Sequence, residues 1–388
     1  MDVLNSAERF ALECVRCDSD AEIGSSLGEF FSQYREIDWN SLFGYGDKML
    51  PFISTVIEKH GSSIPIPRRM VSLLRLQHVS TLQKNRGAIE EIKVIARMFH
   101  SHGIPLIFLK GSALLFTVYR DDPGLRKMED IDALLVNQGD LSGAEILLKQ
   151  MGFEEASGKK YYGFDYPTRE WWKERHCHLV YFKGALRFEL HWKADLVSGR
   201  PLLEKLLESS GKMDLNGTEL QMLSPEGNLL VACTNYIKDF TDYRRDLADL
   251  HPRERNSRSF YYRLFYLCEI KKMLQHYRSD LSRENLCGLI HASKYGYGIN
   301  TLLLLAKQIV RAPIPETLIA DMKADRLIRG FVFFQRGCSF DQFRKLFMLR
   351  DVMTFLNDPV PAVRKGLYGV TCAVRTFISK ILMILAKR

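Results

Sequence analysis

Two carboxylates stand two residues apart, as Asp130 and Asp132, at the start of an apolar run that ends at Val136. In a β-strand such residues point to the same face, about 6.5–7 Å apart along the chain. Neighbouring acids repel each other unless a cation lies between them, and Mg²⁺ is held by one or two carboxylates together with substrate phosphates. The pair therefore predicts a divalent-metal site, although acids at strand ends are also common without a metal.

A second chemical signal is the turn Lys110-Gly111-Ser112, which follows the short apolar run Ile104–Leu109. The run predicts a buried strand, and Ala113–Tyr119 predicts the start of a helix. A Gly-Ser turn before a helix offers free backbone N–H groups and the positive end of the helix dipole, which suits a phosphate. The spacing is not that of a Walker A loop.

Residues 176–192 predict a β-hairpin, because two strand-like runs flank Lys183-Gly184. With that two-residue turn, His178 lies opposite Glu189, and His176 lies opposite His191. One face of the hairpin would thus gather a carboxylate, imidazoles and a guanidinium, or it would be an ordinary solvated face. The side chains on this face of the second strand are Arg187, Glu189 and His191.

The elements that must position these residues follow a compact α/β order: strand, helix, strand (130–136), helix (141–151), then hairpin. Residues 1 to about 100 look helical, most clearly Gly87–Gly103, whose final glycine is suited to a helix C-terminus. The charged stretch Arg244–Arg258 is predicted to be a mobile loop. Helices are predicted beyond Pro201, at Pro225–Phe240, Tyr261–Tyr277, Ile299–Arg311 and Pro361–Lys387.

Together these signals resemble the uncharacterised nucleotidyltransferase family of the DNA-polymerase-beta-like nucleotidyltransferase superfamily, over roughly residues 90–310. The family pattern is a Lys-Gly turn, a Tyr before an acid-Pro turn, and an Arg shortly before an Asp-x-Asp strand. Later matches are FELHWK (188–193), with Glu189 as the third acid, and LSPEGNLLVACTNY (223–236). The matching residues of the first stretch are Lys110, Gly111, Tyr119, Asp122-Pro123, Arg126, Asp130 and Asp132.

The resemblance implies an α+β fold, in which a polymerase-beta-like core with a small mixed sheet and helices occupies residues 96–200. A helical N-terminal region (1–95) and a C-terminal helical domain (201–388) would flank it. It also implies an enzyme that moves an NMP from an NTP such as ATP to a small-molecule, peptide or protein acceptor and releases pyrophosphate. A toxin-like transferase acting on tRNA or other RNA, and a non-catalytic nucleotide-binding module, are the alternatives.

The resemblance also suggests roles for individual residues. Asp130, Asp132 and Glu189 would bind Mg²⁺ or Mn²⁺, and Glu189 is a candidate to take the acceptor's proton. Lys110 and Arg126 would bind phosphate, or would form structural ion pairs with the acidic strand. Gly111 and Ser112 would hold the β- and γ-phosphates. Candidate supporting residues are His178, His191 and Arg187, with His191 either orienting Glu189 or simply packing in its strand.

The composition fits this interpretation without selecting it. The 388 residues carry 55 Lys and Arg against 46 Asp and Glu, a net charge of +9 that suits an anionic partner. Apolar residues make up 46% and charged residues 26%, as in soluble globular proteins. Eight cysteines and no apparent secretory signal predict reduced thiols in the cytoplasm, and no apolar run is long enough to predict stable membrane insertion.

Four further motifs leave alternatives open. The aromatic and basic stretch Lys159–Arg175 could stack on bases or cap the core. The single C-x-x-C of Cys14 and Cys17 is not expected to bind zinc. Strand alternation would place Cys177 on the opposite face from its two flanking histidines, against a shared metal. The basic amphipathic segment Pro361–Arg388 would pack on other helices or lie on a membrane surface.

Overall fold

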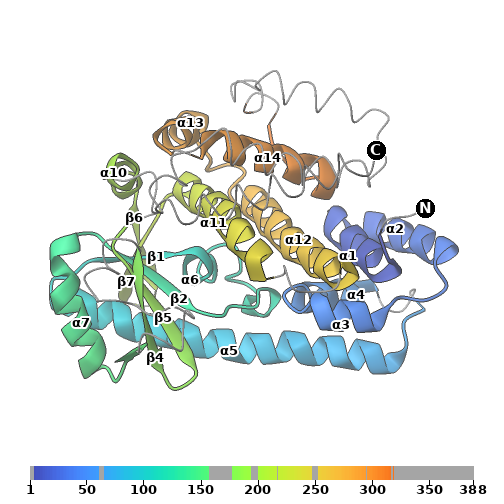
Figure 1. Ribbon diagram of the computed structural model, residues 1–388, viewed down its shortest axis with the longest axis horizontal. Helices are drawn as coiled ribbons and strands as arrows, with labels where there is room; N and C mark the ends of the chain where they lie inside the picture. The colour runs from blue at the N-terminus through green and yellow to red at the C-terminus, as the bar shows by residue number, and fades with distance from the viewer. Residues whose placement is uncertain are drawn as a thin grey trace, which may run out of the picture.

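The structure is a computed structural model that describes residues 4–60, 65–156, 177–193, 200–215, 217–246, 252–293, 295–315 and 318. The aromatic-basic stretch 159–175, His176 and the C-terminal segment 361–388 lie outside these ranges. A mixed sheet lies between helices from both ends of the chain (Figure 1). The helices before the sheet are α1 (Ser6–Arg16), α2 (Asp20–Gln33), α3 (Trp39–Tyr45), α4 (Leu50–His60) and α5 (Arg68–Ser101).

Helix α5 links the N-terminal helices to the sheet (Figure 1). It has 34 residues and begins at Arg68, so it extends upstream of the clearest predicted segment, Gly87–Gly103, within the region predicted to be helical. Its apolar residues Ile92, Ile95 and Phe99 are buried against the sheet, which explains why only this half shows a clear helical period. The helix ends as predicted, because Gly103 adopts a φ of +68° just after the last turn.

Gly87 is expected to be a weak point within α5. A Cβ at this position would meet no atom within 4 Å, and the residue lies in the helix interior. Gly87→Ala should therefore raise the free energy of unfolding by about 0.5–1 kcal/mol, because alanine loses less backbone entropy on folding. Urea denaturation followed by circular dichroism measures this. An unchanged or lower stability would mean that the helix needs a glycine here.

The sheet has seven strands in the order β3-β4-β5-β2-β1-β7-β6. Strand β1 is antiparallel to β2 and parallel to β7, while β2 is parallel to β5. This mixed sheet with flanking helices confirms the predicted α+β class. The strands are β1 (Leu106–Leu109), β2 (Ile131–Leu135), β3 (Glu154–Glu155), β4 (His178–Lys183), β5 (Leu186–His191), β6 (Gly211–Leu215) and β7 (Thr218–Met222).

The hairpin of β6 and β7 was missed, because the chain beyond Pro201 was expected to be helical. A signal was present in Asn216-Gly217, a dipeptide typical of tight hairpin turns, flanked by alternating residues. Gly217 adopts a φ of +82°, a backbone conformation that glycine accepts without strain.

The register of the β4–β5 hairpin differs from the predicted one. The turn residues are Gly184 and Ala185, so that His178 pairs with His191 and Val180 pairs with Glu189. Two-residue hairpin turns require a positive φ at their first position, and Gly184 supplies it with a φ of +59°. A shift of two residues keeps every side chain on its face, so the predicted polar face survives the error.

The two faces of the sheet belong to different apolar cores. Helices α5 and α7 (Leu141–Gln150) cover the face that carries Phe108, Ala133 and Phe188. Ile107 and Leu134 point to the other face, into a core shared with helices from both ends of the chain. The C-terminal helices are α10 (Arg200–Glu208), α11 (Pro225–Asp246), α12 (Pro252–His276), α13 (Arg283–Ala292) and α14 (Gly296–Val310).

The prediction of a mobile loop at 244–258 was wrong for most of that stretch. Helix α11 continues to Asp246 and α12 begins at Pro252. Proline is favoured in the first turn of a helix, and Arg258 pairs with Glu254 one turn earlier, with 3.0 Å between Nη2 and Oε1. Charged pairs of this kind support a helix that lacks an apolar period.

Helix α12 also binds the end of α1. The buried Lys271 ammonium donates to the carbonyl oxygens of Val15 and Arg16, each at 2.9 Å, and lies 2.6 Å from Asp18 Oδ1. These carbonyls are at the C-terminal end of α1, where backbone acceptors lack helical partners. The contact therefore joins segments that are more than 250 residues apart.

Within the described ranges, no helix combines the length and hydropathy of a membrane span.

Candidate active site

Three acids meet where β2 and β5 run side by side. Asp132 and Glu189 are register partners in this parallel pair, and Asp130 directly precedes β2. Neighbouring strands lie about 4.7–4.9 Å apart, and alternation places all three side chains on one face. The structure thus brings together the acids that the sequence indicated.

Asp132 is the most enclosed of the three, with only 1% of its surface exposed. Its Oδ1 accepts hydrogen bonds from Lys110 Nζ at 2.6 Å and from His191 Nε2 at 2.9 Å. Burial alone would raise the pKa of Asp132, but Lys110 and His191 hold it below its usual value. Asp132 is therefore a carboxylate whose charge is balanced by cations in the absence of a metal.

Glu189 is surrounded by basic groups. Arg187 Nη2 donates to Oε1, while Oε2 lies 3.5 Å from His191 Nε2, 3.8 Å from His178 Nε2 and 3.9 Å from Lys110 Nζ. Burial opposes ionisation, but the two histidines and Lys110 hold the pKa of Glu189 well below its usual value. All three candidate supporting residues therefore contact the acids.

Asp130 behaves differently because the nearby cations, Lys110 and Arg187, compensate for its surroundings only in part. Arg187 Nη1 is 3.8 Å from its Oδ2. Burial first, and then the negative charges of Asp132 and Glu189, raise the pKa of Asp130 to about 7. Near neutral pH the three acids thus hold a proton unless a further positive charge arrives.

The donor set fits a hard divalent cation. Asp132, Glu189 and His191 offer ligand atoms within 4.8 Å of one another. The hard donors among them are the carboxylate oxygens of Asp132 and Glu189, to which Asp130 adds its own from the same face. The raised pKa of Asp130 indicates that the negative charge of the three acids is not fully balanced. A cation bound between them would balance it. Mg²⁺ and Mn²⁺ both accept carboxylate oxygens.

Lys110 lies beside the acids because it directly follows the last residue of β1. Leu109 pairs with Asp132 across the antiparallel β1–β2 ladder, so the next residue emerges beside the carboxylate. Lys110 has a φ of +51°, an uncommon conformation for a residue with a side chain, and it starts the five-residue helix α6 (Lys110–Leu114). Strained backbone of this kind often accompanies a functional site.

Gly111 and Ser112 hold this turn in place. A Cβ on Gly111 would collide with the guanidinium of Arg126. The buried Ser112 hydroxyl accepts a hydrogen bond from the backbone N–H of Asp132 at 2.8 Å. The Ser112 side chain thus supports the acid, a role that the sequence did not suggest, and the backbone of the turn lies next to the carboxylates.

Arg126 forms a structural ion pair, but not with the acidic strand. Its Nε donates to Glu269 of α12, and its guanidinium lies over the Phe265 ring at 5.7 Å. Burial would lower the pKa of Arg126, but Glu269 raises it above its ordinary value. Sequence reasoning missed Glu269, because nothing in the helical pattern of residues 261–277 marks it as a partner for a residue 143 positions away.

Loss of this ion pair should destabilise the fold strongly. Arg126→Met would leave the Glu269 carboxylate, 3% exposed, buried without its cation, at a cost of about 3–5 kcal/mol. Urea denaturation measures the change. The double variant Arg126→Met/Glu269→Leu should recover most of the loss, since no charge remains buried. Equal stability of the single and double variants would contradict the interpretation.

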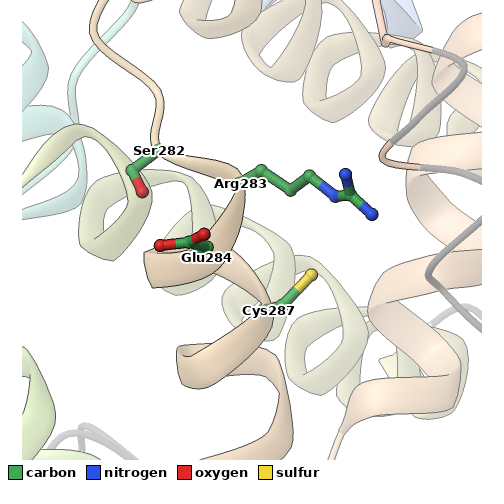
Figure 2. A pocket seen from close by; sticks show the side chains of 4 residues that line it. All are labelled: Ser282, Arg283, Glu284 and Cys287. Carbon is green, nitrogen blue, oxygen red and sulfur yellow. The ribbon is translucent and has the colours of Figure 1, made fainter.

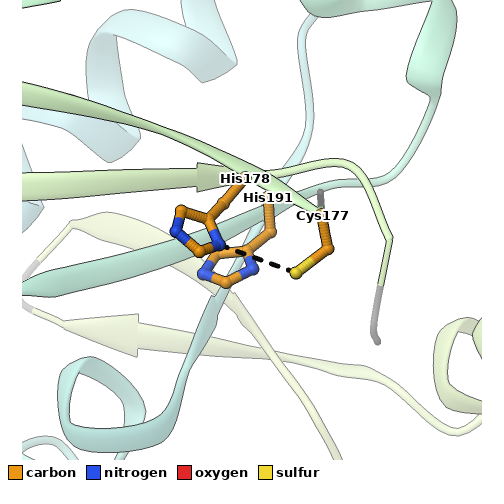
Figure 3. Close-up of side chains that lie close together, drawn as sticks. All are labelled: Cys177, His178 and His191. Carbon is orange, nitrogen blue, oxygen red and sulfur yellow. Dashed lines mark hydrogen bonds between the residues drawn. The ribbon is translucent and has the colours of Figure 1, made fainter. Parts of the chain in front are cut away.

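Cys177 lies on the same side as the histidines, contrary to the prediction from alternation. Its Sγ is 3.6 Å from His178 Nδ1, and His191 lies next to both (Figure 3). Strand β4 begins only at His178, so the alternation of strand residues does not extend to Cys177. The sequence pattern failed here because it applied strand alternation to residues that precede the strand.

A surface pocket of about 440 Å³ lies elsewhere, where α13 begins (Figure 2). Ser282, Arg283, Glu284 and Cys287 line it.

Comparison with known proteins agrees with the fold. Residues 35–309 match the family described as uncharacterised nucleotidyltransferase. The match begins earlier than the resemblance seen in the sequence, so it includes most of the N-terminal helices. No curated protein sequence matches the chain.

Two solved structures are similar to parts of the chain. One is the solution structure of the antibiotic-resistance factor ANT(2'')-Ia, with 15% identity, 55% of this chain and 94% of that chain covered, and a TM-score of 0.29. The other is an antigenic nucleotidyltransferase-like protein from Paracoccidioides brasiliensis, with 17% identity, 58% and 93% covered, and a TM-score of 0.30. The family match spans well over half of the sequence, and the chain therefore belongs to the uncharacterised nucleotidyltransferase family.

Proposed function

We propose that this protein is a metal-dependent nucleotidyltransferase that moves an NMP from an NTP to an acceptor and releases pyrophosphate. The observation that carries the proposal is the triad of Asp130, Asp132 and Glu189 on one face of β2 and β5. Its charge is incompletely balanced, since the pKa of Asp130 is raised to about 7. A site of this kind gains stability from a divalent cation and from the phosphates that accompany it.

Asp130, Asp132 and Glu189 would hold Mg²⁺ or Mn²⁺. The ion supplies charge neutralisation for the attacking oxygen and for the leaving pyrophosphate. Glu189 would be the acid that accepts the acceptor's proton, because its carboxylate is held in a fixed position. Arg187 contacts its Oε1, and the histidines contact its Oε2. Asp132 would be the acid that orients the ion, because two cations and the Ser112 hydroxyl already fix its position.

Lys110 would exchange partners when substrate binds. Its ammonium lies 2.6 Å from Asp132 without a metal, and a divalent cation would replace it there. The β- and γ-phosphates could then accept its charge, with the backbone N–H groups of Gly111 and Ser112 beside them. Arg126 would act indirectly, by packing against Gly111 and keeping this turn in place.

The acceptor is proposed to be a small molecule, a peptide or a protein. An RNA acceptor such as tRNA, and a nucleotide-binding module without catalysis, are the competing functions. All three acids are present, and Lys110 contacts Asp132 and Glu189, which favours catalysis over a module that only binds.

Isothermal titration of the full chain with ATP, CTP, GTP and UTP in the presence of Mg²⁺ tests nucleotide binding. The wild type should bind at least one NTP, and Asp130→Ala/Asp132→Ala should lose this binding. Absence of NTP binding in the wild type, or unchanged binding in the double variant, would refute the proposal.

Labelled ATP separates the possible activities. Transfer of the α-phosphate label to any acceptor supports nucleotidyl transfer, and transfer of the γ-phosphate label indicates a kinase. A protein that transfers neither label but still binds ATP would be a nucleotide-binding module. Digestion of the labelled product with ribonuclease or protease then distinguishes an RNA acceptor from a protein acceptor.

A further inference from the structure

A second group of metal-ligating side chains lies behind the acids, at the start of β4 and the end of β5. Cys177, His178 and His191 offer ligand atoms that all lie within 4.8 Å of one another. Their side chains converge in Figure 3, with the two imidazole rings 4.9 Å apart between centroids. One sulfur and two imidazole nitrogens are the donors that zinc accepts and Mg²⁺ does not.

The spacing of these donors matches a zinc coordination sphere. Zinc lies about 2.3 Å from thiolate sulfur and about 2.0–2.1 Å from imidazole nitrogen, which at a tetrahedral angle places the two ligands about 3.6 Å apart. Cys177 Sγ and His178 Nδ1 are 3.6 Å apart. A metal could therefore enter between them with little movement of either side chain.

A second observation is the position of the buried Nδ1 of His191. Among the described residues this nitrogen makes no hydrogen bond of ordinary geometry, but the imidazole interacts with the Cys177 thiol, and His191 is only 3% exposed. In Figure 3 this nitrogen faces the Cys177 sulfur. A metal ion between this nitrogen and the Cys177 sulfur would bind both atoms.

The opposite nitrogen of each ring lies near a carboxylate, at hydrogen-bond distance for His191 and at a longer distance for His178. His191 Nε2 is 2.9 Å from Asp132 Oδ1, and His178 Nε2 is 3.8 Å from Glu189 Oε2. Histidines that bind a metal through one nitrogen usually donate the other N–H to a carboxylate, which fixes the ring. Here the two carboxylates are acids of the candidate active site.

We propose that Cys177, His178 and His191 form a zinc site next to the acids, with a fourth position open to water or another ligand. Zinc on the Nδ1 atoms would commit both Nε2–H groups to donate to Asp132 and Glu189. The zinc site would thereby position the two carboxylates that a hard cation and a nucleotide approach from the other side. The site does not depend on the proposed transfer reaction.

Cobalt titration of the metal-free full chain, without nucleotide, tests this site. Co²⁺ is the spectroscopic substitute for zinc, and a cysteine ligand produces thiolate-to-cobalt charge-transfer absorption in the near ultraviolet. We expect one equivalent of Co²⁺ to produce this band, zinc to remove it, and excess Mg²⁺ to leave it unchanged. A wild-type protein without the band, or a band that Mg²⁺ removes, would overturn the proposal.

Variants assign the band to its residues. Cys177→Ser and His178→Gln should each abolish it. Cys287→Ser and Cys17→Ser, which change partly buried cysteines elsewhere, should retain it. A band that survives Cys177→Ser would show that another cysteine binds the metal and would overturn the proposal. If Cys177→Ser does not fold, as judged by circular dichroism, the partly exposed His178 decides the outcome.

Discussion

Replacement of Asp132 by asparagine is expected to reduce nucleotidyl transfer on the order of 10²–10³-fold, the usual cost of removing one electrostatic contributor from a reaction centre. The side chain keeps its size, but the anion that Lys110 and His191 surround is lost. The buried side chain at position 132, which is 1% exposed, would then offer no negative charge to a divalent cation or to Lys110. Initial rates of α-label transfer at saturating ATP and Mg²⁺ measure the effect.

The matched control for this variant is Glu145→Gln. Glu145 is also a buried acid, 8% exposed, but it lies on α7 on the opposite face of the sheet. It should retain transfer activity within a few-fold, even if its stability changes. Activity of Asp132→Asn within tenfold of the wild type would exclude Asp132 from the reaction centre.

Asp130→Asn is expected to stabilise the protein at alkaline pH. The folded pKa of Asp130 is about 7 and the usual aspartate value is 3.8, so the folded state binds more protons between these values. The free energy of unfolding therefore falls as pH rises from about 4 to about 7. Above about pH 7 Asp130 is ionised in the folded state, and this loss of stability persists in full. Asparagine carries no charge, so the variant should have a free energy of unfolding about 1–2 kcal/mol higher than the wild type at pH 8, after allowance for partial solvent exposure.

Urea denaturation of both proteins at pH 5 and pH 8 measures this difference. The increase in the free energy of unfolding, relative to the wild type, should be larger at pH 8 than at pH 5. The variant should lose Mg²⁺-dependent NTP binding at both pH values. Higher stability with lost binding is typical of residues retained for function rather than for folding. An equal effect of the substitution at the two pH values would show that Asp130 titrates normally.

Local rules predicted the parts of the site that lie on single strands. The spacing of Asp130 and Asp132 and the alternation around Glu189 depend only on strand geometry, and the structure brings these side chains to one face. The hairpin register was wrong by two residues, because the turn is set by where a positive φ is needed and not by the dipeptide alone. The error left the faces intact, which is why the polar face was still recognised.

Long-range packing explains the rest of what the sequence did not reveal. Arg126 pairs with Glu269 from a distant helix, and the Ser112 hydroxyl binds the backbone of another strand. Neither contact leaves a periodic or local signal, because each depends on how the helices pack against the sheet. The half of α5 before Gly87 was predicted only as part of a generally helical region, because it shows no clear helical period.

The Lys271 contact has a practical consequence for anyone who shortens the chain. The family match begins at residue 35, which invites removal of everything before it. That truncation would delete the carbonyls of Val15 and Arg16, the Asp18 carboxylate and a helix that packs on α12, so that Lys271 would lose these partners. Glu269, the partner of Arg126, lies two residues away on α12. The boundary of sequence similarity is thus not a safe place to cut, because the first helix packs on the same helix that supplies the partner of Arg126.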